Sequence, residues 1–264
     1  MTSNSELKIS LAAWSLHREF FDNTIDQLGM LEACAEFGIT GFELVNTFFR
    51  SPQYAYLRHM KKRAGELGVE LLLIMCDAEG DLAHVDKAKR EVAARSHRKW
   101  IDIACVLGCH SIHVNIRGEE DDPDAMRERA AEGLRMVLDY ASGTGISVLL
   151  ENHGGLSSDA VWLTSLVELV ADPQLGTLPD FGNFPDETDR YQAVETLMPQ
   201  AKAVSAKCYD FDSDGNETKI DFPRMMEIVK AGGYSGYVGI EFEGQDMPER
   251  DGIQACKALL ERLI

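Results

Sequence analysis

The sequence predicts an α/β protein whose parallel strands close into a (β/α)8 barrel. Short apolar runs of strand length alternate with amphipathic segments of helix length, which is typical of parallel βαβ units. This strand-then-helix pattern occurs eight times, without a linker or a low-complexity segment, and the count favours a closed barrel over an open sheet. The chain has 264 residues, a length normal for a barrel that forms one domain. We therefore expect a single domain over residues 1–264.

The predicted strands are runs rich in leucine and β-branched residues. Such runs suit strands buried on both faces, as in a parallel sheet. They cover residues 8–16, 41–46, 70–76, 111–116, 146–153, 176–181, 201–208 and 236–244.

Each strand is followed by a segment with apolar residues three and four positions apart, the spacing of a helix that buries one face. We expect Ser157 or Ser158 to cap the fifth helix. The predicted helices cover residues 24–37, 52–67, 82–107, 122–141, 157–170, 187–198, 222–231 and 248–263.

Composition excludes several classes of protein. The formal charge is −18, from 44 acidic and 26 basic residues, and this field repels a phosphate backbone, so we expect no nucleic-acid partner. No apolar run approaches the length of a membrane span, and residues 1–8 lack the apolar core of a signal peptide. The six cysteines show no paired C-x-x-C spacing, which suits reduced thiols. These features predict a cytoplasmic protein without a membrane partner.

The fifth predicted strand ends in Glu151, Asn152 and His153, followed by two glycines. Strand side chains alternate, so Glu151 and His153 are expected on the same side. A buried carboxylate without a partner is unfavourable, so Glu151 requires a cation, a metal ion or a proton nearby. The alternative is a strand that simply ends in a polar loop.

Polar groups follow the other strands as well, and in such barrels the active site lies at the carboxyl ends of the strands. Alternation places Ser205 with Lys207, and Glu241 with Glu243, on common sides. The strand ends together offer Trp14, His17, Glu43, Asn46, Asp77, His113, Asn115, Arg117, Glu151, Asn152, His153, Asp180, Asn183, Ser205, Lys207, Glu241 and Glu243.

Three of these carboxylates, Glu151, Asp180 and Glu241, would converge over one barrel mouth and repel each other. A divalent cation relieves such repulsion, and an oxygen-rich ligand set suits Mg²⁺ or Mn²⁺. The alternative is that each carboxylate caps a helix or pairs with an arginine.

The sequence resembles the xylose isomerase-like superfamily of TIM barrels, the sugar phosphate isomerase/epimerase group that also includes tagatose and psicose 3-epimerases, hydroxypyruvate isomerase and endonuclease IV. The resemblance spans nearly the whole chain. It is carried by the stretches Gly41-Phe42-Glu43-Leu44, Leu150-Glu151-Asn152-His153, Leu178-Pro179-Asp180-Phe181-Gly182-Asn183, Gly233-Tyr234 and Gly239-Ile240-Glu241-Phe242-Glu243-Gly244.

The resemblance implies a metal held by Glu151, Asp180, Glu241 and a strand-seven histidine. The chain departs from this pattern, because the matching stretch reads Ser205-Ala206-Lys207-Cys208. Either the metal, expected to be Mn²⁺ or Mg²⁺, binds through three carboxylates with water or His153, or Lys207 replaces part of its charge.

The resemblance also implies an activity: an isomerase or epimerase of a small sugar or related hydroxy-carbonyl compound. Glu151 and Glu241 would remove and return a proton through an enediolate, with Lys207 as a further catalytic group. The predicted substrate-binding residues are Trp14, Glu43, His113, Arg117, His153 and Glu243, although Trp14 and His113 also suit core positions.

Two other functions remain open from the sequence. A lyase or deglycosidase would remove a proton beside a keto group with the same carboxylates. A barrel that binds sugar without catalysis would explain the missing histidine. The endonuclease branch is disfavoured, because the extra histidines of a zinc cluster are not evident. Family members are often oligomers, so a homo-oligomer is a further expectation.

Overall fold

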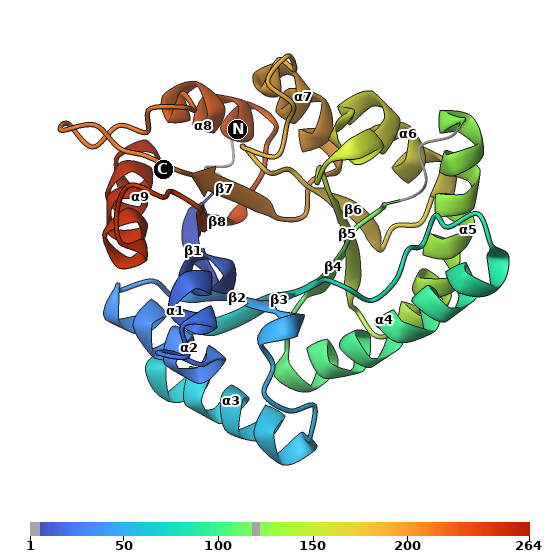
Figure 1. Ribbon diagram of the computed structural model, residues 1–264, viewed down its shortest axis with the longest axis horizontal. Helices are drawn as coiled ribbons and strands as arrows, with labels where there is room; N and C mark the ends of the chain where they lie inside the picture. Colours follow the sequence, from blue (N-terminus) through green and yellow to red (C-terminus); the bar gives the residue numbers. More distant parts are fainter. Residues whose placement is uncertain (1–5, 118–121) are drawn as a thin grey trace.

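A computed structural model describes residues 6–117 and 122–264. The prediction that residues 1–8 do not form a signal peptide concerns a segment whose first five residues lie outside the described part. Eight parallel strands stand at the centre of the molecule and helices surround them (Figure 1). The strands are β1 (Leu7–Ala12), β2 (Gly41–Val45), β3 (Glu70–Cys76), β4 (Ser111–Val114), β5 (Ser147–Glu151), β6 (Leu175–Leu178), β7 (Val204–Cys208) and β8 (Gly236–Phe242).

The strand order is β6-β5-β4-β3-β2-β1-β8-β7, and every neighbouring pair is parallel. The two end strands are joined by parallel bridges between Thr177 and Ala201 and between Asp180 and Ser205. The backbone N–H of Ser205 also donates to the carbonyl of Pro179 at 2.9 Å. These links close the sheet, and the predicted (β/α)8 barrel is confirmed.

The helices cover the outside of the sheet, where their apolar faces pack against the strands (Figure 1). None of them, within the described residues, is long and apolar enough to cross a membrane. They are α1 (His17–Phe21), α2 (Gln27–Glu36), α3 (Tyr54–Leu67), α4 (Lys87–Leu107), α5 (Pro123–Ala141), α6 (Ala160–Val170), α7 (Arg190–Leu197), α8 (Phe222–Ala231) and α9 (Glu249–Leu263), with short 3₁₀ turns η1 (Ala13–Leu16), η2 (Asn46–Phe48), η3 (Gly155–Ser158) and η4 (Met198–Gln200).

The first strand is shorter than predicted. β1 ends at Ala12, and the residues that follow form η1 and then α1 instead of continuing the strand to residue 16. The Ser15 hydroxyl fixes this turn, because it donates to the carbonyl of Ile240 at 3.0 Å and accepts from the N–H of Phe242 at 2.9 Å. Trp14 therefore lies on a turn above the barrel, and not on a strand.

The cap of the fifth predicted helix also differs. Asp159 caps α6, because its carboxylate accepts from the backbone N–H groups of Val161 and Trp162. The Ser157 and Ser158 hydroxyls instead accept from the N–H groups of the preceding loop, at residues 153 and 154. The expected serine cap is wrong, and the serines hold the loop after β5 in place.

Candidate active site

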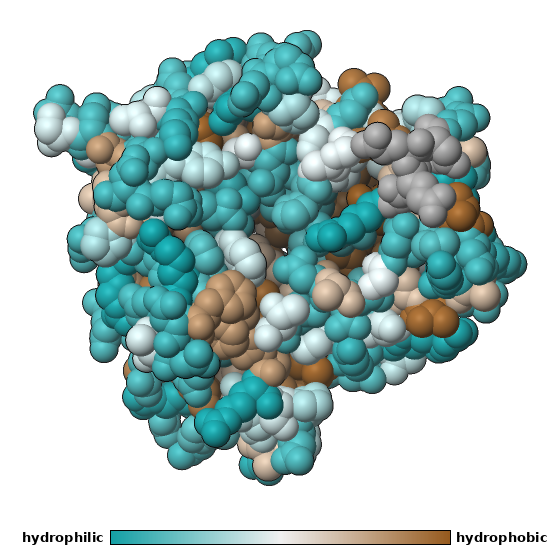
Figure 2. Space-filling view, in the orientation of Figure 1, coloured by the Kyte–Doolittle hydropathy of each residue, from teal (hydrophilic) through white to brown (hydrophobic). Residues whose placement is uncertain are grey.

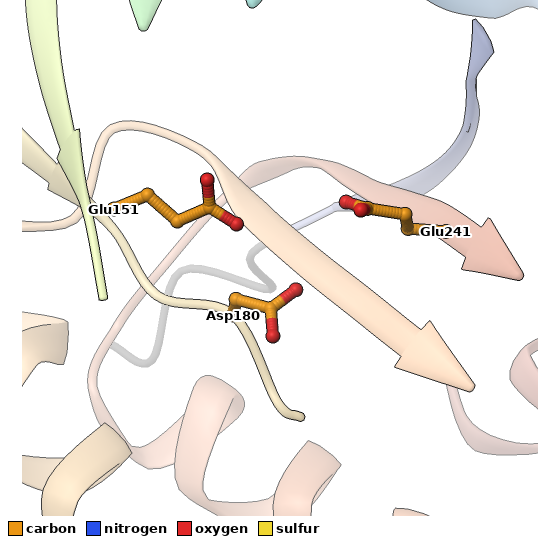
Figure 3. A group of neighbouring side chains, drawn as sticks. All are labelled: Glu151, Asp180 and Glu241. Carbon is orange, nitrogen blue, oxygen red and sulfur yellow. The ribbon is translucent and has the colours of Figure 1, made fainter. Parts of the chain in front are cut away.

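Three buried carboxylates converge at the carboxyl ends of the strands. Glu151 is the last residue of β5, Asp180 follows β6, and Glu241 lies near the end of β8. Each offers an oxygen that lies within 4.8 Å of the others, and their side chains point toward a common space (Figure 3). All three residues are buried. The structure thus brings together the three residues that the sequence places at separate strand ends.

Lys207 supplies positive charge to this cluster. It is buried, and its Nζ lies 3.2 Å from Glu241 Oε1 and 3.4 Å from Glu243 Oε2. It also donates to Asn183 Oδ1 at 2.9 Å. Burial disfavours the ammonium ion, but the carboxylates of Asp180, Glu241 and Glu243 outweigh this effect and raise the pKa of Lys207. The surrounding carboxylates therefore favour the charged form of Lys207.

His113, on β4, supplies a second partner. Its Nε2 lies 3.0 Å from Glu151 Oε2, yet neither ring nitrogen makes a well-aligned hydrogen bond within the described residues. Burial alone would lower the pKa of His113, but the adjacent Glu151 raises it. Burial would raise the pKa of Glu151, but His113 lowers it below the usual range. The pair favours an ionised Glu151.

The other two carboxyls behave in the opposite way. Burial raises the pKa of Asp180 to about 7, although Lys207 opposes the shift. Burial also raises the pKa of Glu241. The Ser205 hydroxyl lies between them, 2.7 Å from Asp180 Oδ2 and 3.0 Å from Glu241 Oε2. Such environments move the pKa values of neighbouring carboxyls apart, so that one carboxyl is ionised while its neighbours hold a proton more readily.

The donor set suits a hard divalent cation. Asp180 Oδ1 accepts from the backbone N–H groups of Gly182 and Asn183, which fixes its orientation, and its Oδ2 faces the cluster. Ser205 stands where the resemblance implies histidine, so its hydroxyl and the oxygens of the three carboxylates form the cluster, with the His113 imidazole beside Glu151. Oxygen ligands fit Mg²⁺ or Mn²⁺. The buried acidic triad is thus able to hold a metal ion.

A cavity of about 460 Å³ opens above the cluster. Lys207 and Asp180 do not line this cavity. Most of the predicted site residues line it, namely Trp14, His113, Arg117, Glu151, His153, Glu241 and Glu243. A larger depression of about 700 Å³ lies between α7 and α8, and none of these strand-end groups lines it.

Glu43 lies outside the cavity. It is buried inside the barrel, where it accepts from the Ser10 hydroxyl at 2.6 Å. A Cβ atom on Gly239 would lie 2.4 Å from Glu43 Oε1, so β8 passes this carboxyl only because residue 239 is glycine. Burial raises the pKa of Glu43 to about 7. Glu43 does not line the cavity, so its position gives no support to the predicted substrate contact.

Trp14 lines the cavity wall, but it also packs within the protein. The indole stacks on His17 at a centroid distance of 5.1 Å and on Phe48 at 5.7 Å. Its Nε1 donates to Glu243 Oε1 at 2.7 Å. Trp14 therefore orients Glu243, and Glu243 in turn forms an ion pair with Lys207.

Sequence reasoning missed Phe21 and gave no role to Asn183, which it placed among the polar residues at the strand ends. Asn183 connects the two sides of the cluster, since its amide donates to Glu151 Oε1 at 3.0 Å and accepts from Lys207. The only available signal was its place in the Asp180-to-Asn183 stretch. Phe21 lines the cavity from the end of α1, a five-residue helix too short to show a periodic pattern.

Comparison with known proteins gives one local match in sequence. The chain is 44% identical over 64 residues to the C-glycoside deglycosidase alpha subunit of Arthrobacter globiformis. The match covers 23% of this chain and only 18% of that protein.

Solved structures match over nearly the whole chain. A D-tagatose 3-epimerase-like protein superposes with a TM-score of 0.79 and 20% identity, covering 97% of each chain. The 3-keto-D-glucoside 4-epimerase of E. coli superposes with a TM-score of 0.77 and 16% identity, and the match covers 98% of this chain and 100% of that chain. The chain therefore has the architecture of sugar isomerases and epimerases.

The xylose isomerase-like TIM barrel family model matches residues 31–263, which include all three converging carboxylates and seven of the eight strands. The sequence resemblance is thus confirmed, and the chain belongs to the family of xylose isomerase-like TIM barrels.

Proposed function

We propose that this protein is a metal-assisted isomerase or epimerase of a small sugar or a related hydroxy-carbonyl compound. The carrying observation is the buried triad of Glu151, Asp180 and Glu241, whose oxygens lie within 4.8 Å of one another. The two glutamates of the triad line a cavity of about 460 Å³. A cavity of this size suits a small molecule. The architecture shared with sugar epimerases supports the proposal.

The two glutamates take different parts in the proton transfer. Glu151, with its lowered pKa, is the base that removes the proton from the carbon beside the carbonyl. Glu241, with its raised pKa, is the acid that returns a proton to the opposite face or the adjacent carbon. Electrons of the broken C–H bond move into the enediolate and return to form the new C–H bond. Isomerisation and epimerisation therefore need no external oxidant.

The other groups hold charge and orientation. A divalent ion at the triad would stabilise negative charge on the substrate oxygens. Lys207 keeps Glu241 and Glu243 in place, and Asn183 holds Glu151. His113, Arg117 and His153 line the cavity with nitrogen groups, which suit sugar hydroxyls or an anionic group.

A second candidate is a lyase or deglycosidase of a keto-sugar. It uses the same base, but the intermediate expels a group from the neighbouring carbon instead of regaining a proton there. The local match to a C-glycoside deglycosidase alpha subunit supports this second candidate. Product analysis separates the two, because only the lyase or deglycosidase splits the substrate.

The test combines metal content with proton exchange. The purified protein, incubated with Mn²⁺ and desalted, should hold about one ion per chain by elemental analysis, and Glu151→Gln should lose most of it. Ketoses incubated with the wild type in D₂O should gain deuterium by mass spectrometry, and the variant should do so roughly 10²–10⁴-fold more slowly.

The matched control is Glu168→Gln, an exposed glutamate on α6, which should change neither readout. The proposal is contradicted if the wild-type protein binds no ion and exchanges no proton in any of a panel of ketoses and keto-sugars.

A further inference from the structure

Phe21 is an exposed aromatic ring at the mouth of the active-site cavity. Its exposed fraction is 60%. Other large apolar side chains are also exposed in the described part of the chain, but among them only Phe21 lines the cavity that contains Glu151 and Glu241. Figure 2 shows an apolar patch beside the central hollow, over the segment that contains α1. Scattered exposed residues need no explanation, whereas an apolar patch at a site does.

The ring is supported by an aromatic cluster. Phe21 meets Phe20, Phe48 and Trp14 edge to face, with centroid distances of 5.6, 6.0 and 6.2 Å. The flat surface of Trp14 is largely used within the protein, by His17 and Phe48. Phe21 is therefore the aromatic group of this wall with most surface left for a ligand.

The helix that carries Phe21 is anchored to the barrel. Glu249, buried at the start of α9, accepts from the backbone N–H groups of Arg18 at 2.7 Å and Glu19 at 3.0 Å. Arg250 donates two hydrogen bonds to the Glu19 carboxylate, at 2.9 and 3.1 Å. An exposed ring held this firmly loses little conformational freedom when a ligand covers it, which is the condition for a preorganised contact.

We propose that Phe21, supported from behind by the buried ring of Phe48, forms a subsite for an aromatic or similarly apolar substituent attached to the sugar. The substrate class is then a glycoside whose sugar ring carries a keto group and whose aglycone is apolar, in preference to a free monosaccharide. The keto group supplies the carbonyl that the proposed proton transfer requires. The charged floor holds the sugar ring, and the substituent lies against Phe21 at the mouth. This inference rests on the proposed sugar-binding role of the cavity and specifies its substrate class.

The test uses matched ligands that the proposed chemistry leaves intact. Phenyl and methyl β-D-glucosides, β-D-galactosides and β-D-xylosides are titrated into the wild type by calorimetry. In at least one pair the phenyl member should bind about tenfold more tightly. Phe21→Ala should lower the phenyl-glycoside affinity by about the same factor, and Phe21→Leu by less, with the methyl glycoside unchanged. Tyr54→Ala, at an exposed aromatic residue outside the cavity, should change neither affinity.

Equal affinity within all three pairs, including undetectable binding of both members, overturns the proposal. A wild-type dimer that Phe21→Ala converts to a monomer in light scattering also overturns it, because a second copy would then cover the ring. Binding requires no turnover, so selective phenyl-glycoside binding without proton exchange would reject the proposed chemistry and keep this subsite.

Discussion

The two sides of the barrel mouth are built by different physical means. The side formed by β5 to β8 holds Glu151, Asp180, Lys207 and Glu241 in a buried network of ion pairs and hydrogen bonds. The side formed by η1, α1 and η2 holds stacked aromatic rings, with Phe48 almost fully buried. One side is ordered by charges that must balance, and the other by packing of apolar surface.

This difference separates the chemistry from the recognition of the substrate. Charges in the network determine one another's protonation, so a change to one member alters the others. The aromatic side carries no titratable group in its ring cluster except His17, so its contacts should tolerate changes in pH and salt. Substitutions on the two sides should therefore fail in different ways.

The largest expected effect comes from removing the buried cation. Lys207→Met leaves Glu241 and Glu243 without their shared partner in a buried setting. We expect the free energy of unfolding, measured with urea at pH 7, to fall by about 3–5 kcal/mol. The control Lys219→Met removes an exposed ion pair with Asp210 and should lose less than about 1 kcal/mol. Similar losses in both variants would show that the network is not held by charge balance.

A smaller effect, of opposite sign, is expected at Glu43, whose carboxyl is buried near Glu241 and Glu151. Its pKa of about 7 in the folded chain lies above the value in the unfolded chain, so between about pH 4.5 and 7 the folded state holds a proton that the unfolded state has lost. The contribution of Glu43 to the free energy of unfolding of the wild type therefore falls as the pH rises through that window. The amide in Glu43→Gln does not titrate, so the variant lacks this pH-dependent loss of stability.

We expect Glu43→Gln to exceed the wild type in free energy of unfolding by roughly 2–3 kcal/mol at pH 8, with the difference vanishing near pH 4. Urea titrations across this range measure it, with Glu168→Gln as the control. A difference that is the same at every pH would contradict the assignment of the proton to Glu43.

The smallest effect concerns the anchor of the aromatic side. Glu249→Gln retains one carbonyl oxygen where two carboxylate oxygens cap α1, and it removes the negative charge there. Thermal unfolding should show a loss of about 1 kcal/mol. Amide hydrogen exchange at Arg18 and Glu19 should quicken, whereas Asp251→Asn on the same helix should leave these two amides protected. Unchanged exchange in Glu249→Gln would mean that the ring cluster alone holds α1.

The barrel was predictable from the sequence because its signals are local. Apolar strands, helix spacing and side-chain alternation placed Glu151, Asp180 and Glu241 at the ends of three different strands, and the structure brings them together. Alternation also accounts for the shared side of Ser205 and Lys207, which both contact Glu241.

The remaining features depend on contacts that no local pattern contains. Glu43 lies in the middle of β2, a strand of the expected kind, but its burial depends on the close passage of Gly239 on β8. Phe21 follows a turn whose geometry depends on Ser15 bonding to β8. Trp14 was predicted as a substrate-binding residue, yet its hydrogen-bond partner Glu243 lies 229 positions away in the sequence. Such long-range pairs need the folded coordinates.

The anchoring of α1 by α9 also bears on biosynthesis. The carboxylate that caps α1 belongs to a residue 231 positions later in the chain, so the first amides of α1 have no side-chain cap until the last helix has been translated. During that interval the phenylalanines of this segment are exposed on the nascent polypeptide and available to chaperones. The surface proposed to select the substrate is thus among the last parts of the protein to mature.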